Sequence, residues 1–220
     1  MVFLVKSACL TNHTRVAMSE PIVFVIDDEA ASREVLVELV NTMQLPVKAF
    51  ASAEDFVNAY QGQRPACIVS DQRMPGMTGI DLVEWLQERE LTIPVVMVTA
   101  FPDTQSTVRA VRGGALNLLE KPCSKESLWR EIVEAIRVDQ ENSLQDAERE
   151  EAKNKVASLA EAEQLVAELL LDGHPNKVVA SRLDVSLRTV EARRASIFKK
   201  FGVSSIAGMV QTWLTAQSRR

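Results

Sequence analysis

The chain has 220 residues, of which 46% are hydrophobic and 25% charged, and its formal net charge is −5. These values are ordinary for a globular protein and leave room for one large domain or two small ones. No run of 18 apolar residues occurs, so the sequence predicts no membrane-spanning helix. Three isolated cysteines and two histidines provide neither a disulfide framework nor metal-ligand spacing, a usage that fits the reducing cytoplasm.

Charge is distributed unevenly along the chain. Residues 1–139 carry a net charge of −6, whereas residues 158–220 carry +3. An acidic N-terminal part and a basic C-terminal part suggest two separate functions, with the basic part binding a polyanion. Residues 1–20 lack a signal-peptide cleavage site and are interpreted as a disordered extension, with Met18 an alternative start to Met1 because the first strand pattern begins just after it.

Short apolar runs alternate with amphipathic segments over residues 21–139. Such runs are typical of strands buried on both faces, and the segments between them have the periodicity of helices. Strands are predicted at 22–26, 46–50, 66–70, 94–99 and 116–120, and helices at 32–43, 52–60, 79–90, 104–114 and 124–138. Ser52 and Asp55 form a capping box at the second helix. Five βα units in order predict an α/β domain with a five-stranded, doubly wound, mostly parallel sheet.

The helical periodicity also predicts which residues face the core. The expected inward residues are Val35, Leu36, Leu39, Val40 and Met43 in the first helix and Leu128, Ile132, Val133 and Ile136 in the fifth. Residues 140–157 are polar and lack glycine and proline, so they either extend the fifth helix or form a semi-rigid linker. Only helical patterns follow, which predicts a small all-α domain over 158–220.

Polar residues stand at the carboxyl ends of the predicted strands, where open α/β sheets bind their ligands. Asp27 and Asp28 end the first strand, Asp71 the third and Thr99 the fourth, and Lys121 follows the fifth. Three converging carboxylates repel one another, and a hard dication such as Mg2+ relieves the repulsion. A carboxylate nucleophile, a metal, a lysine and a hydroxyl together indicate an aspartyl-phosphate site.

These residues belong to longer motifs. Residues 21–138 resemble the receiver domain of bacterial two-component response regulators through IDDE (26–29), SDQRMPGMTGIDL (70–82), VTA (98–100) and EKP (120–122). The resemblance implies a flavodoxin-like fold and phosphorylation by a sensor histidine kinase. It implies no enzyme beyond the receiver's own phosphoryl transfer and dephosphorylation.

The resemblance assigns roles residue by residue. Asp71 matches the phospho-acceptor, which binds Mg2+ together with Asp27, Asp28 and the backbone carbonyl of Arg73. The other matched groups are the switch hydroxyl of Thr99, the phosphoryl-contacting Lys121, and Pro122 at a position where receivers usually have a cis peptide bond.

The chain departs from the receiver pattern at two positions. Leu118 replaces the aromatic partner of the threonine switch, which weakens the usual threonine–aromatic mechanism, and Cys123 replaces a common phenylalanine. Two rival enzyme classes are disfavoured. A haloacid-dehalogenase-type phosphatase needs Asp-x-Asp, and a nucleotide-binding loop needs glycines after the first strand; neither pattern is present.

The basic tail contains two helices joined by a tight turn. Residues 175–183 are predicted to bury Val178, Val179 and Leu183, and Ser186 caps a helix over 187–201 whose inward residues are Val190, Ile197 and Phe201. Two such helices constitute a helix-turn-helix, whose second helix fits the major groove of DNA.

Residues 158–217 resemble the LuxR-type DNA-binding domain of NarL/FixJ response regulators, above all in GHPNKVVASRLDVSLRTVEARRASIFKKFGVSS (173–205). The predicted DNA-binding residues are Asn176, Lys177, Ser186, Arg188, Thr189, Glu191, Arg193, Arg194 and Lys200. Arg193 replaces a common histidine, and Leu159–Glu163 lacks the threonine and arginine of the usual Leu-Thr-x-Arg-Glu opening, which removes an N-cap and a partner for Glu163.

These patterns predict a cytoplasmic response regulator that is phosphorylated on Asp71 and thereby controls sequence-specific DNA binding and transcription. Its expected partners are a sensor histidine kinase, double-stranded DNA, the transcription machinery and a second copy of the chain, joined on phosphorylation through the 104–138 face. Two alternatives stay open: a phosphorylation-independent DNA-binding regulator, made plausible by Leu118, and a receiver that signals through protein contacts with the tail as a docking bundle.

Overall fold

The structure is a computed structural model that describes residues 20–100, 108 and 114–218. The chain divides into two compact units, Met1–Gln140 and Glu141–Arg220, and each is described by itself. The predicted helix over 104–114 lies outside the described residues except at 108 and 114.

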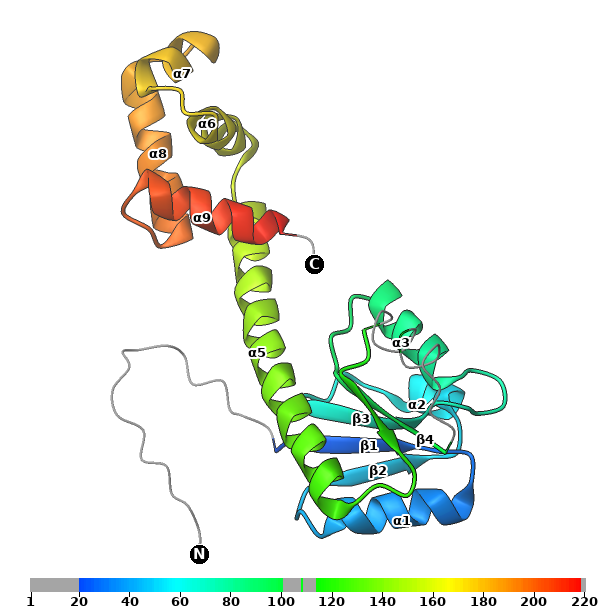
Figure 1. The fold of residues 1–220 in the computed structure, drawn as a ribbon. Helices are drawn as coiled ribbons and strands as arrows, with labels where there is room; N and C mark the ends of the chain where they lie inside the picture. The colour runs from blue at the N-terminus through cyan, green and yellow to red at the C-terminus, as the bar shows by residue number, and fades with distance from the viewer. Residues whose placement is uncertain (1–19, 101–107, 109–113, 219–220) are drawn as a thin grey trace, which may run out of the picture. The chain divides into compact units, whose positions relative to one another are not determined.

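A five-stranded parallel sheet forms the centre of the first unit (Figure 1). Its strands are β1 (Ile22–Ile26), β2 (Val47–Phe50), β3 (Ala66–Asp71), β4 (Val95–Thr99) and β5 (Asn117–Glu120). They lie in the order β2-β1-β3-β4-β5, and all neighbouring pairs are parallel. The predicted doubly wound α/β sheet is confirmed, and its strand order reverses between β1 and β3, where such sheets bind ligands.

Helices cover both faces of this sheet. They are α1 (Ala30–Asn41), α2 (Ala53–Ala59), α3 (Gly79–Glu88) and α5 (Lys125–Ala157). One hydrophobic core joins the sheet to α2 and α3, and the other joins its opposite face to α1 and the first part of α5. The Ser52 side chain caps α2 by accepting the N–H of Asp55 at 3.1 Å, as the capping motif predicts.

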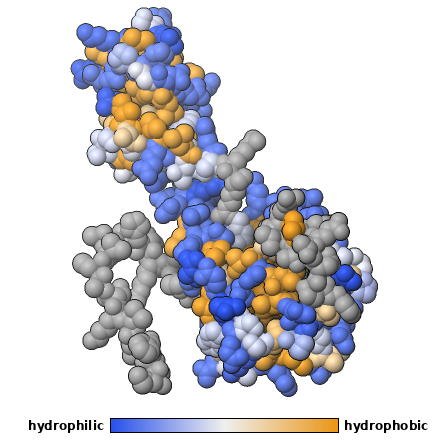
Figure 2. Space-filling view, in the orientation of Figure 1, coloured by the Kyte–Doolittle hydropathy of each residue, from blue (hydrophilic) through white to orange (hydrophobic). Residues whose placement is uncertain are grey.

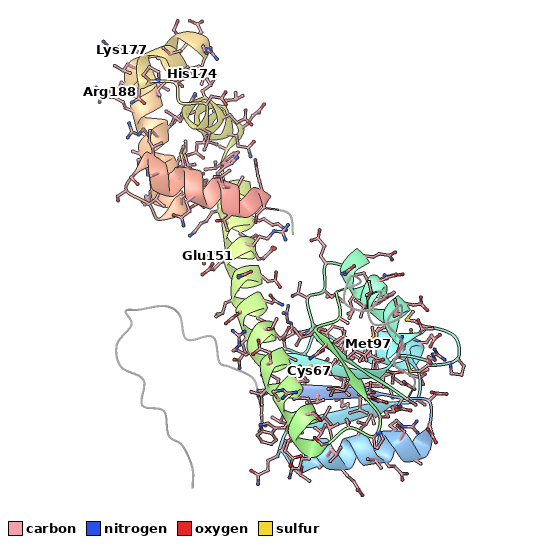
Figure 3. All side chains as sticks on the ribbon, in the orientation of Figure 1. Cys67, Met97, Glu151, His174, Lys177 and Arg188 are labelled. Atoms are coloured by element: carbon pink, nitrogen blue, oxygen red, sulfur yellow. The ribbon has the colours of Figure 1, made fainter. Side chains whose placement is uncertain are left out.

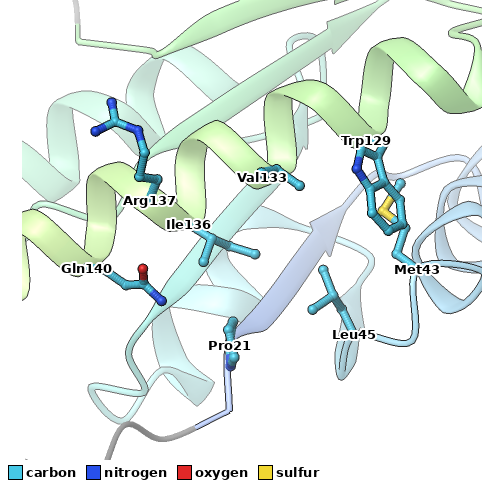
Figure 4. A pocket seen from close by; sticks show the side chains of 8 residues that line it. All are labelled: Pro21, Met43, Leu45, Trp129, Val133, Ile136, Arg137 and Gln140. Atoms are coloured by element: carbon cyan, nitrogen blue, oxygen red, sulfur yellow. The ribbon is translucent and has the colours of Figure 1, made fainter. Parts of the chain in front are cut away.

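Two of the residues predicted to face this core are exposed instead. Val35 and Val133 are 56% and 49% exposed, so their inward assignment is wrong. The apolar stripe of each helix is wider than the face that touches the sheet. Val133 lines an apolar groove with Trp129 of the same helix and Pro21, which precedes β1 (Figure 4).

Helix α5 runs without interruption from Lys125 to Ala157. Of the two alternatives that the sequence leaves open for residues 140–157, the structure therefore has the helical extension. The segment suits a helix because it lacks glycine and proline and is rich in helix formers. Within it, Lys155 pairs with Glu151 one turn earlier at 2.8 Å.

Four further helices form the second unit with the end of α5. They are α6 (Glu161–Leu171), α7 (Asn176–Arg182), α8 (Leu187–Phe201) and α9 (Ile206–Gln217). The predicted all-α domain is confirmed, and Val190, Ile197 and Phe201 of α8 are buried in its core as expected. In α7, Val179 is buried as predicted, but Val178 is 37% exposed, because the helix turns Val179 and Ala180 toward the core.

Apolar side chains gather on the surface over α9 (Figure 2), where Ile206 and Leu214 are 37% and 60% exposed. None of the helices in the described ranges is both long and apolar enough to cross a membrane.

Candidate functional site

Three carboxylates meet at the carboxyl ends of β1 and β3. Asp27 and Asp28 follow β1, and Asp71 is the last residue of β3, its neighbour in the sheet. One carboxylate oxygen of each of the three lies within 4.8 Å of the others. The structure thus brings together the three acidic residues that the sequence analysis selected.

Asp27 is completely buried, and three donors hold its carboxylate. Its Oδ1 accepts the backbone N–H of Glu29 at 2.9 Å, and its Oδ2 accepts the hydroxyl of Ser32 at 2.7 Å and the ammonium of Lys121 at 2.7 Å. Arg33 donates to the Asp27 carbonyl at 2.6 Å. Ser32 and Arg33 belong to no motif that singled them out in the sequence, although their place in the first turn of a helix that follows the acidic pair was a usable signal.

Lys121 connects two of the carboxylates. Its Nζ lies 2.7 Å from Asp27 Oδ2 and 3.3 Å from Asp71 Oδ2. The Lys121–Pro122 peptide bond is cis, as the resemblance implies. Burial by itself lowers the pKa of Lys121, but the hydrogen bond to Asp27 and the charge of Asp71 outweigh it, so the pKa lies above its usual value.

Asp71 is the half-buried member of the cluster. Burial raises the pKa of its carboxyl group, while the nearby Lys121 charge and the backbone N–H of Arg73 oppose the rise. The three carboxylates still outnumber the two cations described here, the Lys121 ammonium and the Arg33 guanidinium, so negative charge remains in excess. A small oxygen-rich cluster of this kind fits a hard cation such as Mg2+ better than a soft one.

The two residues predicted to form the switch, Thr99 and Leu118, lie on the adjacent strands β4 and β5. Thr99 ends β4 and is 1% exposed, and its carbonyl accepts the N–H of Lys121 at 2.8 Å. Leu118 pairs with Met97 across β4 and β5 and packs against the core under α2 and α3. The neighbouring strand therefore sets the position of Lys121 relative to Thr99.

The second unit presents a cationic surface on α7 and α8. Lys177 and Arg188 are exposed and lie at the same end of this unit (Figure 3). Ser186 accepts the N–H of Thr189 at 3.1 Å and so caps α8, as predicted. Asn176 begins α7, Glu191 is exposed on α8, and Arg193 is partly exposed on the same helix.

Two cationic side chains among the predicted DNA-binding residues, Arg194 and Lys200, also have partners inside the domain. The Arg194 guanidinium stacks over the Phe198 ring at 5.0 Å. The Lys200 ammonium donates to Glu163 at 2.5 Å and to the Ser158 carbonyl at 2.8 Å. Lys200 therefore joins α8 to the start of α6, and it supplies the partner for Glu163 whose loss the sequence analysis expected from the missing arginine.

The Glu163 carboxylate accepts hydrogen bonds from three donors. Besides Lys200, the Ser196 hydroxyl donates at 2.6 Å and the Ala160 N–H at 2.8 Å. Glu163 thus supplies one half of a capping box at a helix start that lacks the usual threonine. The hydrogen bond from Lys200, followed by those from Ser196 and Ala160, lowers the pKa of Glu163 to about 2.

We expect this network to make the helical domain sensitive to acid. Because the folded-state pKa of Glu163 lies below its unfolded value, the network stabilises the domain above about pH 4.5, and this stabilisation is lost as the pH falls toward 2. The loss should be about 2 kcal/mol, allowing for screening of the partly exposed ammonium. Urea unfolding at pH 6 and pH 3, followed by Trp213 fluorescence in a Trp85→Phe/Trp129→Phe background, measures it.

Glu163→Gln should remove most of the pH dependence. Glu161→Gln is the matched control, since Glu161 is exposed in the same helical turn. If the free energy of unfolding depended on pH equally in Glu163→Gln and in the parent chain, the acid sensitivity could not be assigned to this carboxylate.

Comparisons with known proteins agree with this geometry. Residues 23–133 match the family described as the response regulator receiver domain, and residues 157–212 match the LuxR family of bacterial regulatory proteins. The chain belongs to the response regulators, and it carries a receiver domain followed by a LuxR-type DNA-binding domain.

Several relatives match this chain over most of their own length. The transcriptional regulatory protein FixJ of Bradyrhizobium diazoefficiens is 34% identical over 88% of this chain and 95% of its own. The transcriptional regulatory protein TdiR of Thauera aromatica is 32% identical over 86% of this chain and 83% of its own. The solved structure of the response regulator StyR is 34% identical, with a TM-score of 0.75 over 88% of this chain and 98% of its own.

Proposed function

We propose that this response regulator accepts a phosphoryl group on Asp71 from a sensor histidine kinase and thereby controls its binding to DNA. The observation that carries the proposal is the meeting of Asp27, Asp28 and Asp71 with Lys121 at the carboxyl edge of the sheet, in a chain that also holds a LuxR-type domain. We assign residues 21–139 to the receiver, 140–157 to a helical linker and 158–220 to the DNA-binding domain. Because its partner is DNA and its donor a kinase, we place the protein in the cytoplasm.

The cluster supports in-line phosphoryl transfer. An oxygen of Asp71 attacks phosphorus as the bond from phosphorus to the donor nitrogen breaks. Mg2+ held by Asp27, Asp28, Asp71 and the Arg73 carbonyl would neutralise charge on the transferred oxygens. Lys121, which already reaches Asp71, would pair with the phosphoryl group once it is in place.

The response to phosphorylation would begin at Thr99. A phosphoryl group offers acceptor oxygens beside the Thr99 hydroxyl, and a move of Thr99 toward them would vacate space next to Leu118. We propose that two receivers then pair through the 104–138 face, where Trp129 and Val133 are 43% and 49% exposed. Pairing of two chains would bring two DNA-binding domains to adjacent half-sites, and the effective concentration would raise the affinity.

DNA would be bound by α7 and α8. On α8, Arg188, Glu191, Arg193 and Arg194 would meet base edges and phosphates in the major groove. Near the starts of the two helices, Asn176, Lys177, Ser186 and Thr189 would contact the DNA backbone. Lys200, held by Glu163, contributes through the packing of α8 rather than as a free cation. Contacts with the transcription machinery would follow once the dimer is on DNA.

Binding of a fluorescein-labelled 30-base-pair duplex of random sequence, measured by anisotropy at four salt concentrations, tests the proposal. With Mg2+ and beryllofluoride, a stable phosphoryl mimic, we expect tighter binding than without. The plot of log K against log salt should have a slope steeper than about −2.5, which corresponds to three or more neutralised phosphates. Arg188→Gln should reduce that slope by about 1.

Lys153→Gln is the matched control, because Lys153 is exposed on the polar part of α5. The alternatives give different results. Tight binding without any response to beryllofluoride would indicate a phosphorylation-independent regulator. A flat salt dependence would indicate that the tail docks on protein and would overturn the DNA-binding part of the proposal.

A further inference from the structure

The loop over residues 72–78, between β3 and α3, carries two groups that the phosphorylation site needs. The backbone N–H of Arg73 donates to the Asp71 carboxylate, and the Arg73 carbonyl is the proposed third protein ligand of the metal. Backbone groups can serve in this way only if the loop is held in one conformation, and holding a loop costs conformational entropy. The contacts that fix this loop therefore bear on the chemistry at Asp71.

The two ends of the loop are fixed locally. At the α3 end, Thr78 and Asp81 form a capping box. Gly79 then packs back on the strand, where its N–H donates to the Gln72 carbonyl at 3.2 Å. A Cβ atom at Gly79 would lie 2.5 Å from the Asp71 carbonyl oxygen, so only glycine allows this approach.

The middle of the loop is held by a residue from a different helix. Glu54, in the first turn of α2, accepts the backbone N–H of Met77 at 2.7 Å through its Oε1. The same oxygen lies 2.5 Å from where a Cβ atom of Gly76 would be, and Gly76 has a left-handed φ of +75°. Gly76 thus supplies both the turn and the space that let the carboxylate reach the loop. Such charge-assisted hydrogen bonds are stronger than neutral ones.

We infer that Glu54 is a positioning residue for metal binding and phosphorylation: its carboxylate holds the loop over residues 72–78 so that the N–H and carbonyl of Arg73 stay directed at the Asp71 site. This inference rests on the proposed function. Glu54 acts through the Met77 N–H and not on the phosphoryl group. Partners of this kind, one step removed from a metal, commonly change its affinity 10- to 100-fold.

Two conservative variants separate the contact from the charge. Glu54→Gln loses the charge but keeps an oxygen at the same reach, so it can still accept the Met77 N–H. Glu54→Asp keeps the charge but is one methylene shorter and cannot reach. Glu54→Ala loses both, and Asp55→Ala is the matched control, because it removes an exposed carboxylate from the same helical turn.

Two measurements on the full chain decide the matter: the Kd for Mn2+, determined by electron paramagnetic resonance, and the initial rate of phosphorylation by acetyl phosphate at graded Mg2+ concentrations. We expect the Mn2+ Kd to rise about tenfold in Glu54→Ala and Glu54→Asp and to stay within about threefold in Glu54→Gln and Asp55→Ala. The Mg2+ concentration that gives the half-maximal phosphorylation rate should also rise in Glu54→Ala and Glu54→Asp.

Other patterns would overturn the inference. Suppose that Glu54→Asp had the Mn2+ Kd of the parent chain and Glu54→Gln had the raised Kd of Glu54→Ala. The negative charge at position 54, and not the hydrogen bond to the Met77 N–H, would then determine metal binding. Unchanged Mn2+ binding in all folded variants would show that Glu54 only stabilises the fold. If Glu54→Ala does not fold, the comparison of the Gln and Asp variants decides alone. A parent chain that bound no Mn2+ and took no phosphoryl group would overturn the proposed function as well, so the two failures are distinguishable.

Discussion

Asp71→Asn is expected to abolish phosphorylation completely, because an amide oxygen is not a nucleophile toward phosphorus. Asp71 supplies the carboxylate at the end of β3, and the variant has none at that position. Incubation with radiolabelled acetyl phosphate and Mg2+ should label the parent chain and leave the variant unlabelled. In light-scattering measurements with Mg2+ and beryllofluoride, the parent should shift from monomer to dimer mass, and the variant should stay monomeric.

The fold should survive this change. The folded-state pKa of Asp71 lies above its unfolded value, so the ionised carboxylate costs stability at neutral pH, and an amide removes that cost. The variant should therefore melt at the same or a higher temperature than the parent. Glu120→Gln is the matched control, since Glu120 is an exposed carboxylate at the end of β5 and should be labelled like the parent. Label on Asp71→Asn would contradict the assignment of the phospho-acceptor.

Arg64→Ala should destabilise the receiver by about 3–5 kcal/mol, because it leaves a buried carboxylate without its cation. Asp139 is fully buried, and its Oδ1 lies 2.5 Å from the Arg64 Nη2. Its Oδ2 accepts the Ala66 N–H at 2.8 Å, and Arg64 also donates to Thr92 at 2.9 Å. The network ties the beginning of β3 to α5 at the point where the first unit ends.

Urea unfolding in a Trp213→Phe background measures the effect, because Trp85 and Trp129 then report on the receiver alone. Arg137→Ala is the matched control, since Arg137 forms an exposed pair with Glu134 on the same helix and should cost about 0.5 kcal/mol. Similar losses in the two variants would show that the Arg64–Asp139 pair contributes no more than a surface ion pair.

A response regulator is thus recognisable here from local patterns and motifs alone. Strand and helix periodicities span only a few residues, so the order of the elements and the caps at Ser52 and Ser186 could be predicted without tertiary information. The convergence of Asp27 and Asp71 could also be predicted, because parallel strands bring their carboxyl ends to one edge of the sheet. The resemblance then identified the domains and suggested the cis bond before Pro122.

The partners of these residues could not be predicted in the same way. Lys121 and Asp27 are 94 positions apart, Arg64 and Asp139 75 apart, and Lys200 and Glu163 37 apart. Sequence periodicity reports which face of an element is apolar, but not which distant side chain lies across from a polar one. The contact of Glu54 with the loop at Met77 arises for the same reason, and no motif marks it.

Spacing along the chain, and the parallel sheet that it specifies, are enough to predict most of the elements, the helical second domain and the acidic edge of the sheet. Tertiary packing was needed to show that residues 140–157 continue α5, that Val35 and Val133 face outward, and that Lys200 pairs with Glu163. These outcomes depend on how much of each helix the neighbouring surface covers and on which charges meet across the fold. Both are properties of packing, which a one-dimensional pattern does not contain.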